Sequence, residues 1–211
     1  MLRILITDDH AVVRRGLEQV LEEEFDKVVF GEAQNTREMI EHLQKKTWDV
    51  VILDITLPGR SGLEVLEELK LTHPNLPVLV LSMHPEDQYG IRVLKSGASG
   101  YMTKESAPDE IVMAIKKILR GGKYISPALA ERLASNLGVD REKPLHEALS
   151  DREYEVMVMI CAGKILKEIA QKLDLSIKTV STYRSRILKK MKMENNAELI
   201  RYAIKNQLVV D

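Results

Sequence analysis

Short apolar runs alternate with longer amphipathic stretches through the first 120 or so residues of the chain. Four of these runs lie at residues 2–7, 49–53, 77–81 and 99–103. Such short, continuous apolar runs are typical of parallel strands, which are buried on both faces of a sheet. The alternation predicts five strand–helix units and therefore an α/β doubly wound, five-stranded parallel sheet.

The amphipathic stretches predict the helices of this first part. Capping-box patterns at Asn35-x-x-Glu38 and Ser61-x-x-Glu64 support two of the helix starts. The expected helices cover residues 11–24, 36–47, 61–72, 86–96 and 107–120.

A change of pattern follows Gly121-Gly122, which ends the last of these helices and predicts a first domain at residues 1–122. Residues 123–147 contain prolines and a glycine around a helix-like stretch at 128–136, so we expect a linker with a short helix. From Ser150, which forms a capping box with Glu153, the pattern is purely helical. A small all-α domain is therefore expected at 148–211, with helices at 150–161, 166–173, 177–192 and 196–206 and a tight turn at 174–176.

The helix expected at 177–192 has an apolar face and a basic face. Between Lys178 and Lys192 there are six basic residues and no acidic one. Short hydroxyl side chains among cations suit the major groove of DNA, because cations neutralise phosphates while short side chains let the helix approach base edges. A basic face alone is usually only solvated, but the preceding short helix and turn predict the second helix of a helix-turn-helix. The apolar face consists of Ile177, Val180, Ile187, Leu188 and Met191, and the basic face of Lys178, Ser181, Thr182, Ser185, Lys189 and Lys192, flanked by Arg184, Arg186 and Lys190.

Charge is divided unevenly between the two predicted domains. The chain has a net charge of −1, but residues 1–122 hold 15 Lys and Arg against 20 Asp and Glu, while residues 150–211 hold 12 against 8. A basic C-terminal part favours nucleic acid as a partner. The single cysteine, Cys161, excludes an internal disulfide framework. No apolar run approaches the ~18 residues of a membrane span, and no signal-peptide core precedes Asp8, so we expect a cytoplasmic protein without a membrane partner.

Charged and hydroxyl residues stand where the predicted strands end. Asp8 and Asp9 follow the run at 2–7, Asp54 follows the run at 49–53, and Lys104 follows the run at 99–103. The carboxyl ends of parallel strands meet at one edge of a sheet, where ligands bind. Three clustered carboxylates repel one another unless a cation neutralises them, and carboxylate oxygens suit Mg²⁺. A single Asp could instead cap a helix, but the joint arrangement favours a site that accepts a phosphoryl group on an aspartate.

The acidic pair, Asp54 with its flanking sequence, Ser82, Tyr101 and Lys104 together resemble the receiver domain of two-component response regulators, a flavodoxin-like fold. The resemblance implies that a sensor histidine kinase phosphorylates Asp54. It implies that Asp9, Asp54 and the backbone carbonyl of Thr56 bind Mg²⁺, with Asp8 acting through water. Ser82 and Lys104 would contact the phosphoryl group, and Tyr101 would change rotamer. Ser82 replaces the commoner threonine, and the bulky Met83, in place of a small residue, is a candidate for restricting access to Asp54.

Residues 148–208 resemble the LuxR-type DNA-binding domain. The matching residues are Leu149-Ser150-x-Arg152-Glu153, Gly163, Lys167-Glu168-Ile169-Ala170, Leu173, Ser176-x-Lys178-Thr179-Val180 and Ala197-Glu198-Leu199. With both domains in this order, the chain is similar to the NarL/FixJ group of response regulators. The resemblance implies that Lys178, Ser181, Thr182 and Ser185 face bases, that Thr179, Arg184, Lys189 and Lys190 meet phosphates beside Arg186, and that the last helix, with Ala197, Ile200, Ala203 and Ile204, mediates dimerisation.

We therefore expect a phosphoprotein that regulates transcription. Phosphorylation would favour a homodimer that binds double-stranded DNA at an inverted repeat, with RNA polymerase as a candidate partner. Two alternatives stay open at this stage. The first is a phosphohydrolase, which usually needs a second acid where this chain has Thr56. The second is an output domain that binds protein, for which a basic helix is a poor interface core. We do not expect an enzyme, beyond self-catalysed phosphoryl transfer and slow dephosphorylation of the receiver.

Overall fold

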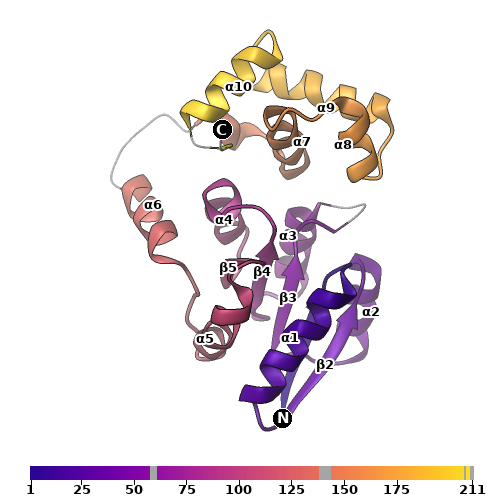
Figure 1. The fold of residues 1–211 in the computed structure, drawn as a ribbon, viewed down its shortest axis with the longest axis vertical. Coiled ribbons are helices and arrows are strands. Elements are labelled where there is room, and N and C mark those ends of the chain that lie inside the picture. Colours follow the sequence, from indigo (N-terminus) through magenta and orange to yellow (C-terminus); the bar gives the residue numbers. More distant parts are fainter. Residues whose placement is uncertain (58–60, 138–143, 207, 210–211) are drawn as a thin grey trace. The chain divides into compact units, whose positions relative to one another are not determined.

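The computed structural model describes residues 1–57, 61–137, 144–206 and 208–209. By its internal contacts the chain divides into two compact units, residues 1–133 and residues 134–211. Figure 1 shows the elements and their labels.

The first unit is built on a five-stranded parallel sheet with the strand order β2-β1-β3-β4-β5. In the register, Thr7 pairs with Leu53, and Ser82 pairs with Thr103. The residues that follow these pairs therefore emerge side by side at one edge. The strands are β1 (Leu2–Thr7), β2 (Val28–Ala33), β3 (Val50–Asp54), β4 (Val78–Ser82) and β5 (Gly100–Thr103).

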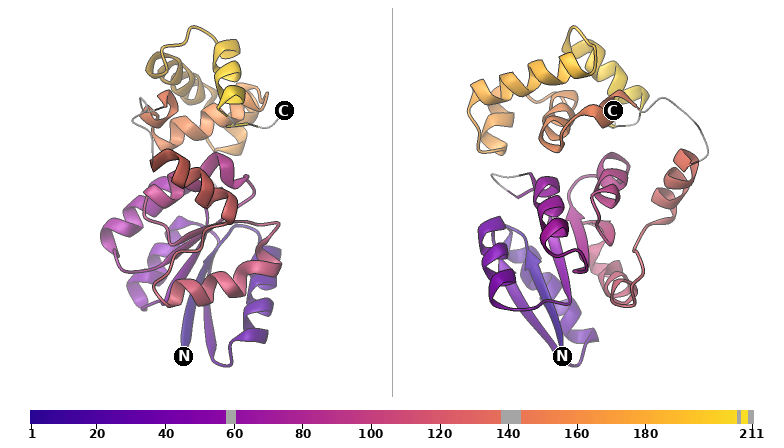
Figure 2. Two further views of the ribbon diagram at one scale, coloured as in Figure 1. Left: turned by 90° about the vertical axis from the view of Figure 1, so that its left-hand side faces the viewer. Right: turned by 180° about the vertical axis from the view of Figure 1, so that it is seen from behind.

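Helices lie on both sides of this sheet (Figure 2). On one face, side chains of β1, β3, β4 and β5 form a single apolar cluster with Leu17 and Leu21 of α1 and with Ile111 and Ile115 of α5. β3 and β4 are buried throughout, as expected for strands covered on both faces. The helices are α1 (Ala11–Glu24), α2 (Thr36–Lys45), α3 (Gly62–Thr72), α4 (Glu86–Lys95) and α5 (Ala107–Leu119). The predicted fold class is confirmed.

After α5 comes the helix α6 (Pro127–Leu137), which extends the predicted linker helix by one residue at each end. The second unit then contains only helices. They are the 3₁₀ helix η1 (Leu145–Ala148), α7 (Asp151–Cys161), α8 (Leu166–Lys172), α9 (Ile177–Lys190) and α10 (Asn196–Lys205). Because α7 packs against α8, α9 and α10, it supplies the centre of this unit.

Helix caps follow the predicted patterns at two of three places. Ser150 and Glu153 form the complete capping box of α7. Asn35 accepts the Glu38 N–H at the start of α2, but the Glu38 carboxylate accepts from the Gln34 N–H and from the Asn35 side-chain amide rather than from the Asn35 backbone N–H. Ser61 begins α3 without a side-chain capping bond in the described part of the chain, so that capping-box prediction was wrong.

Candidate functional sites

The edge where the strands end gathers two buried carboxylates around one ammonium. Asp8 directly follows β1 and Asp54 ends β3, and both are 1 % exposed. Lys104 follows β5, and its Nζ lies 2.6 Å from Asp54 Oδ2 and 2.6 Å from Asp8 Oδ2. Burial by itself would lower the pKa of Lys104, but the hydrogen bonds with the two carboxylates outweigh it and raise the pKa. The site therefore holds a firmly protonated lysine between two aspartates.

The carboxylate of Asp54 is held from both of its oxygens. Thr56 donates its backbone N–H and its hydroxyl to Asp54 Oδ1, at 2.7 and 2.6 Å, while Lys104 binds Oδ2. These donors fix the orientation of the Asp54 carboxylate, a group that can act as a nucleophile toward phosphorus.

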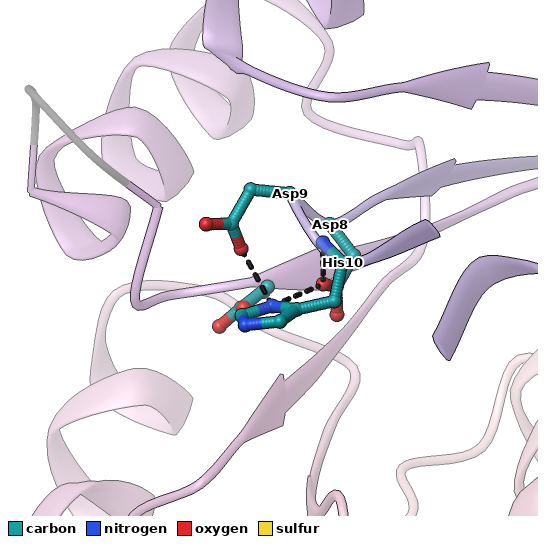
Figure 3. A group of neighbouring side chains, drawn as sticks. Asp8, Asp9 and His10 are labelled. Atoms are coloured by element: carbon teal, nitrogen blue, oxygen red, sulfur yellow. Dashed lines mark hydrogen bonds and ion pairs between the residues drawn. The ribbon is translucent and has the colours of Figure 1, made fainter. Parts of the chain in front are cut away.

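His10 joins this cluster, and sequence reasoning missed it. Its Nδ1 lies 2.8 Å from Asp9 Oδ1 and 3.1 Å from Asp8 Oδ1, with the ring turned toward both carboxylates (Figure 3). One ligand atom from each of Asp8, Asp9, His10 and Asp54 lies within 4.8 Å of the others. Three carboxylates at this spacing fit a hard divalent cation such as Mg²⁺. His10 occupies the N-cap position of α1 without a side-chain cap bond, so neither aspartate serves as that cap.

Arg14 is a second residue that the sequence did not single out. It is 5 % exposed, and it donates to the Asp8 carbonyl at 2.7 Å and to Glu32 Oε2 at 2.8 Å. Arg14 therefore fixes the loop that carries the acidic pair. The available signal was its position on the apolar stripe of α1, three and seven residues before Leu17 and Leu21.

Ser82 and Tyr101 meet through the backbone of one residue. Ser82 is fully buried and its Oγ accepts the His84 N–H at 3.0 Å, while the Tyr101 hydroxyl donates to the His84 carbonyl at 2.7 Å. The Tyr101 ring is 1 % exposed, and this burial raises the pKa of its hydroxyl. Met83, between Ser82 and His84, is 71 % exposed. A displacement of Ser82 would therefore change its hydrogen bond with His84, the residue that also binds Tyr101.

In the second unit, α9 separates its two faces largely as predicted. Val180, Ile187 and Met191 are buried without exposed surface, and Leu188 is 9 % exposed. Ile177 is 50 % exposed, so its predicted place in the core was wrong; as the first residue of α9 it lies at the helix end. The exposed residues include Lys178, Ser181, Thr182, Ser185, Arg186 and Lys189.

Several cations and hydroxyls of α9 already have partners inside the unit. Arg184 Nε donates to Asn196 Oδ1 at 2.8 Å, and Lys190 Nζ lies 2.6 Å from Glu153 Oε2. The Thr179 hydroxyl lies 2.8 Å from that of Ser176, the cap of α9. Thr182 donates to the Lys178 carbonyl at 2.9 Å. These contacts orient the side chains relative to the helix before any partner binds.

Comparison with known families decides the identity of the chain. Residues 4–116 match the response regulator receiver domain, and residues 147–203 match the bacterial regulatory proteins of the luxR family. The chain is a response regulator. It is 33 % identical to the response regulator UvrY of Escherichia coli K12 over 99 % of this chain and 96 % of that one. It is 34 % identical to the response regulator GacA of Pseudomonas aeruginosa over 99 % and 98 %.

Solved structures of RcsB from Salmonella typhimurium are similar to this response regulator over both domains. One aligns with a TM-score of 0.69 and 27 % identity, covering 99 % of this chain and 98 % of that chain. Another, bound to the promoter rprA in the presence of the phosphomimetic BeF₃⁻, aligns with a TM-score of 0.64 and 28 % identity over 96 % and 98 %. The predicted resemblance to the NarL/FixJ group is confirmed, and the chain is a two-component transcription regulator with a LuxR-type DNA-binding domain.

The last helix of this response regulator presents only part of the predicted dimer set on its surface. Ala197 and Ile204 are exposed, the latter by 44 %, and Ile200 is half-buried. Ala203 has no exposed surface and packs inside its own unit, so its side chain is not available to a partner. Among the described residues, no helix has the length and apolar character needed to cross a bilayer.

Proposed function

We propose that a sensor histidine kinase phosphorylates this response regulator on Asp54. The observation that carries the proposal is the Asp54 carboxylate, buried at the end of β3 and bonded by Thr56 and Lys104. In the transfer, an Asp54 oxygen bonds to phosphorus while the bond from phosphorus to the imidazole nitrogen of the kinase breaks. Lys104, already 2.6 Å from Asp54, then neutralises charge on the phosphoryl oxygens.

Asp8, Asp9, Asp54 and the backbone carbonyl of Thr56 would hold Mg²⁺, with Asp8 acting through water. The close spacing of the carboxylate oxygens supports this assignment. The cation, when bound, offsets the repulsion among the carboxylates and the incoming phosphate. The receiver would catalyse only its own phosphorylation and a slow hydrolysis of the resulting aspartyl phosphate. A phosphohydrolase needs an acid that protonates the leaving group, and the hydroxyl of Thr56 is too weak an acid for that role.

In the proposed switch, Ser82 turns its hydroxyl toward the new phosphoryl oxygens and Tyr101 follows. The shared contact of both residues with His84 supports this coupling. A phosphoryl group adds about −1.5 to −2 charges at this edge, which gives the two states different interaction energies.

The proposed output is a homodimer that binds an inverted repeat in double-stranded DNA and acts on transcription in the cytoplasm, with RNA polymerase as a candidate partner. The proposed domains are residues 1–122 and 148–211, joined by the linker 123–147. Lys178, Ser181, Thr182 and Ser185 would face bases, and Thr179, Arg184, Arg186, Lys189 and Lys190 phosphates. Ala197, Ile200 and Ile204 would form the dimer surface. The similarity to RcsB, which has been solved bound to the promoter rprA, supports this output.

The deciding experiment compares the wild type with Asp54→Asn after treatment with acetyl phosphate and Mg²⁺. We expect a phosphate mass increment on the wild type only, lost when Mg²⁺ is chelated, together with tighter operator binding in a gel shift. A mass increment on Asp54→Asn, or equal operator binding by treated wild type and variant, would contradict the proposal. A gel shift with residues 145–211 alone tests the DNA-binding surface separately.

A further inference from the structure

The chain leaving α5 returns to the edge of the sheet. Tyr124 lies beside Gly100 of β5, and its N–H donates to the Ser99 carbonyl at 2.8 Å. Its hydroxyl donates to Glu110 of α5, and the residue is 7 % exposed. The first residues of the predicted linker are therefore packed on the receiver.

The start of α6 is fastened to α4 in two ways. Ser126, whose Oγ accepts the Leu129 N–H at 3.1 Å, also donates that hydroxyl to Glu86 Oε1 at 2.6 Å. Leu129 has no exposed surface and occupies a notch that exists because residue 90 is a glycine. A Cβ at Gly90 would lie 2.7 Å from Leu129 Cδ2, which is closer than side chains pack.

Residues 82–86 connect this contact to the edge of the sheet that carries Asp54. Ser82 bonds the His84 N–H, Tyr101 bonds the His84 carbonyl, and Glu86, two residues later, bonds Ser126. A shift of Ser82 toward a phosphoryl group on Asp54 would break its hydrogen bond with the His84 N–H. Through this bond the loop before α4, and with it Glu86, is coupled to the position of Ser82.

We propose that α6 is a releasable latch on α4. In the resting receiver, Leu129 fills the notch at Gly90 and Ser126 bonds Glu86. Rearrangement of residues 82–86 weakens both contacts, so that α6 detaches and the α4 surface becomes accessible. This inference rests on the proposed phosphorylation of Asp54. Phosphorylation can shift the balance between attached and detached α6 only by the free energy that the two states differ in. That difference lies in the contacts Leu129–Gly90 and Ser126–Glu86.

Hydrogen exchange of the α6 amides, including Ala130, whose N–H bonds the Ser126 carbonyl at 3.0 Å, measures the latch directly. Adding BeF₃⁻ and Mg²⁺ to the full-length wild type should speed exchange in residues 130–133 by ~10-fold or more. Leu129→Ala should reach a similar rate without BeF₃⁻, because a buried leucine side chain is lost. Leu71→Ala, which truncates a leucine that is 84 % exposed on α3, is the matched control and should leave α6 unchanged.

Fluorine NMR of bound BeF₃⁻ separates the two proposals. Bound BeF₃⁻ with unchanged exchange in α6 would overturn the latch while leaving phosphorylation of Asp54 intact. An absence of bound BeF₃⁻ would overturn the proposed phosphoacceptor site and the coupling with it. Slow exchange in Leu129→Ala, with BeF₃⁻ still bound by the variant as proof of folding, would show that Leu129 does not hold α6.

Discussion

Among the described residues, Lys104 is the one cation that pairs with both buried carboxylates, those of Asp8 and Asp54. Replacing it by methionine leaves Asp8 and Asp54 as uncompensated buried charges. We expect Lys104→Met to lower the free energy of unfolding of the receiver by ~3 kcal/mol without Mg²⁺. Millimolar Mg²⁺ should restore much of this loss, because the cation replaces the missing positive charge. Urea unfolding followed by the fluorescence of Trp48, the one tryptophan of the chain, measures the receiver selectively.

Lys116→Met is the matched control for that prediction. Lys116 also pairs with a carboxylate, that of Glu24, but both side chains are 43 % exposed. Exposed pairs contribute about 0–1 kcal/mol, so the control should lose little, with or without Mg²⁺. Two results would contradict this prediction: equal losses of unfolding free energy in both variants, or no recovery of Lys104→Met with Mg²⁺. Either would mean that Lys104 does not neutralise the carboxylates that are proposed to bind the cation.

Glu153 makes the stability of the second unit depend on pH. Burial would raise the pKa of this carboxyl, but its bonds with Lys190 and with Ser150 outweigh burial and lower it below the ordinary value of 4.5. A carboxyl with a lowered folded pKa stabilises the fold above its unfolded pKa, and this contribution is lost as pH falls. Glu153→Gln should therefore cost ~1–2 kcal/mol at pH 7, and its deficit should shrink between about pH 5 and 3.

Thermal unfolding of the protein, followed by the circular dichroism of its helices at several pH values, tests this expectation. Glu194→Gln, a change at an exposed carboxyl in the same unit, supplies the control and should follow the wild type. A deficit of Glu153→Gln that stays constant down to pH 3 would assign the loss to packing rather than to the charge.

Some site residues could be predicted from the sequence because the order of the strands alone places them, and others could not because the exact start of a helix places them. Asp8, Asp54 and Lys104 end apolar runs, and the topology of a parallel sheet alone brings such residues together. His10 and Arg14 enter through the first turns of α1, where the side-chain direction depends on the exact helix start. Periodicity fixes such a start only to within one or two residues, which also explains the misplaced Ile177.

At the scale of one element, two neighbouring lysines of α9 that are proposed to meet phosphates differ in their contacts within the unit. Lys189 is exposed, whereas Lys190 binds Glu153 at 2.6 Å. Lys189→Ala should reduce the magnitude of the slope of log affinity against log salt by ~0.9 for each protomer bound, because each protomer neutralises one phosphate fewer. Lys190→Ala should change that slope less and should instead lower the thermal stability of the second unit. Fluorescence anisotropy with operator DNA across a salt series measures the slopes.

Ser181→Ala is the complementary change on α9, since Ser181 is exposed on the same face and carries no charge. It should leave the salt slope unchanged while altering the preference among operator sequences. Equal slopes for Lys189→Ala and the wild type would remove Lys189 from the phosphate contacts.

Element boundaries were predicted to within two residues for the helices, because apolar periodicity and caps act locally. The predicted ends at residues 47, 173 and 192 fall one or two residues beyond α2, α8 and α9. The capping role of Ser61 failed for a different reason. A capping box requires a particular side-chain rotamer, and the pattern Ser-x-x-Glu specifies residue types but not the approach of the preceding chain.

At the scale of the whole molecule, the alternating pattern and the charge division were enough to predict an acidic α/β domain followed by a basic helical domain. The linker helix was also predicted, but not the surface on which Leu129 packs. Its notch is formed by Gly90 on α4, 39 positions earlier in the chain. Long-range pairings of this kind depend on the folded surface, which no local pattern of apolar residues describes.

Dimerisation belongs to the same scale, and Ile204 is a large, exposed apolar residue of the proposed dimer surface. The side chain lies on α10 and is 44 % exposed, whereas the neighbouring Ala203 is fully buried. If two copies meet through α10, Ile204→Glu places two like charges in the interface and should weaken binding to a full inverted repeat by ~10-fold or more, about 1.4 kcal/mol. Binding to a single half-site should stay at the wild-type level, since α9 is unchanged. Leu71→Glu, at an exposed leucine on α3, controls for added charge. Loss of half-site binding by Ile204→Glu would indicate damage to the domain, and full wild-type binding to the inverted repeat would place the dimer contact on another surface.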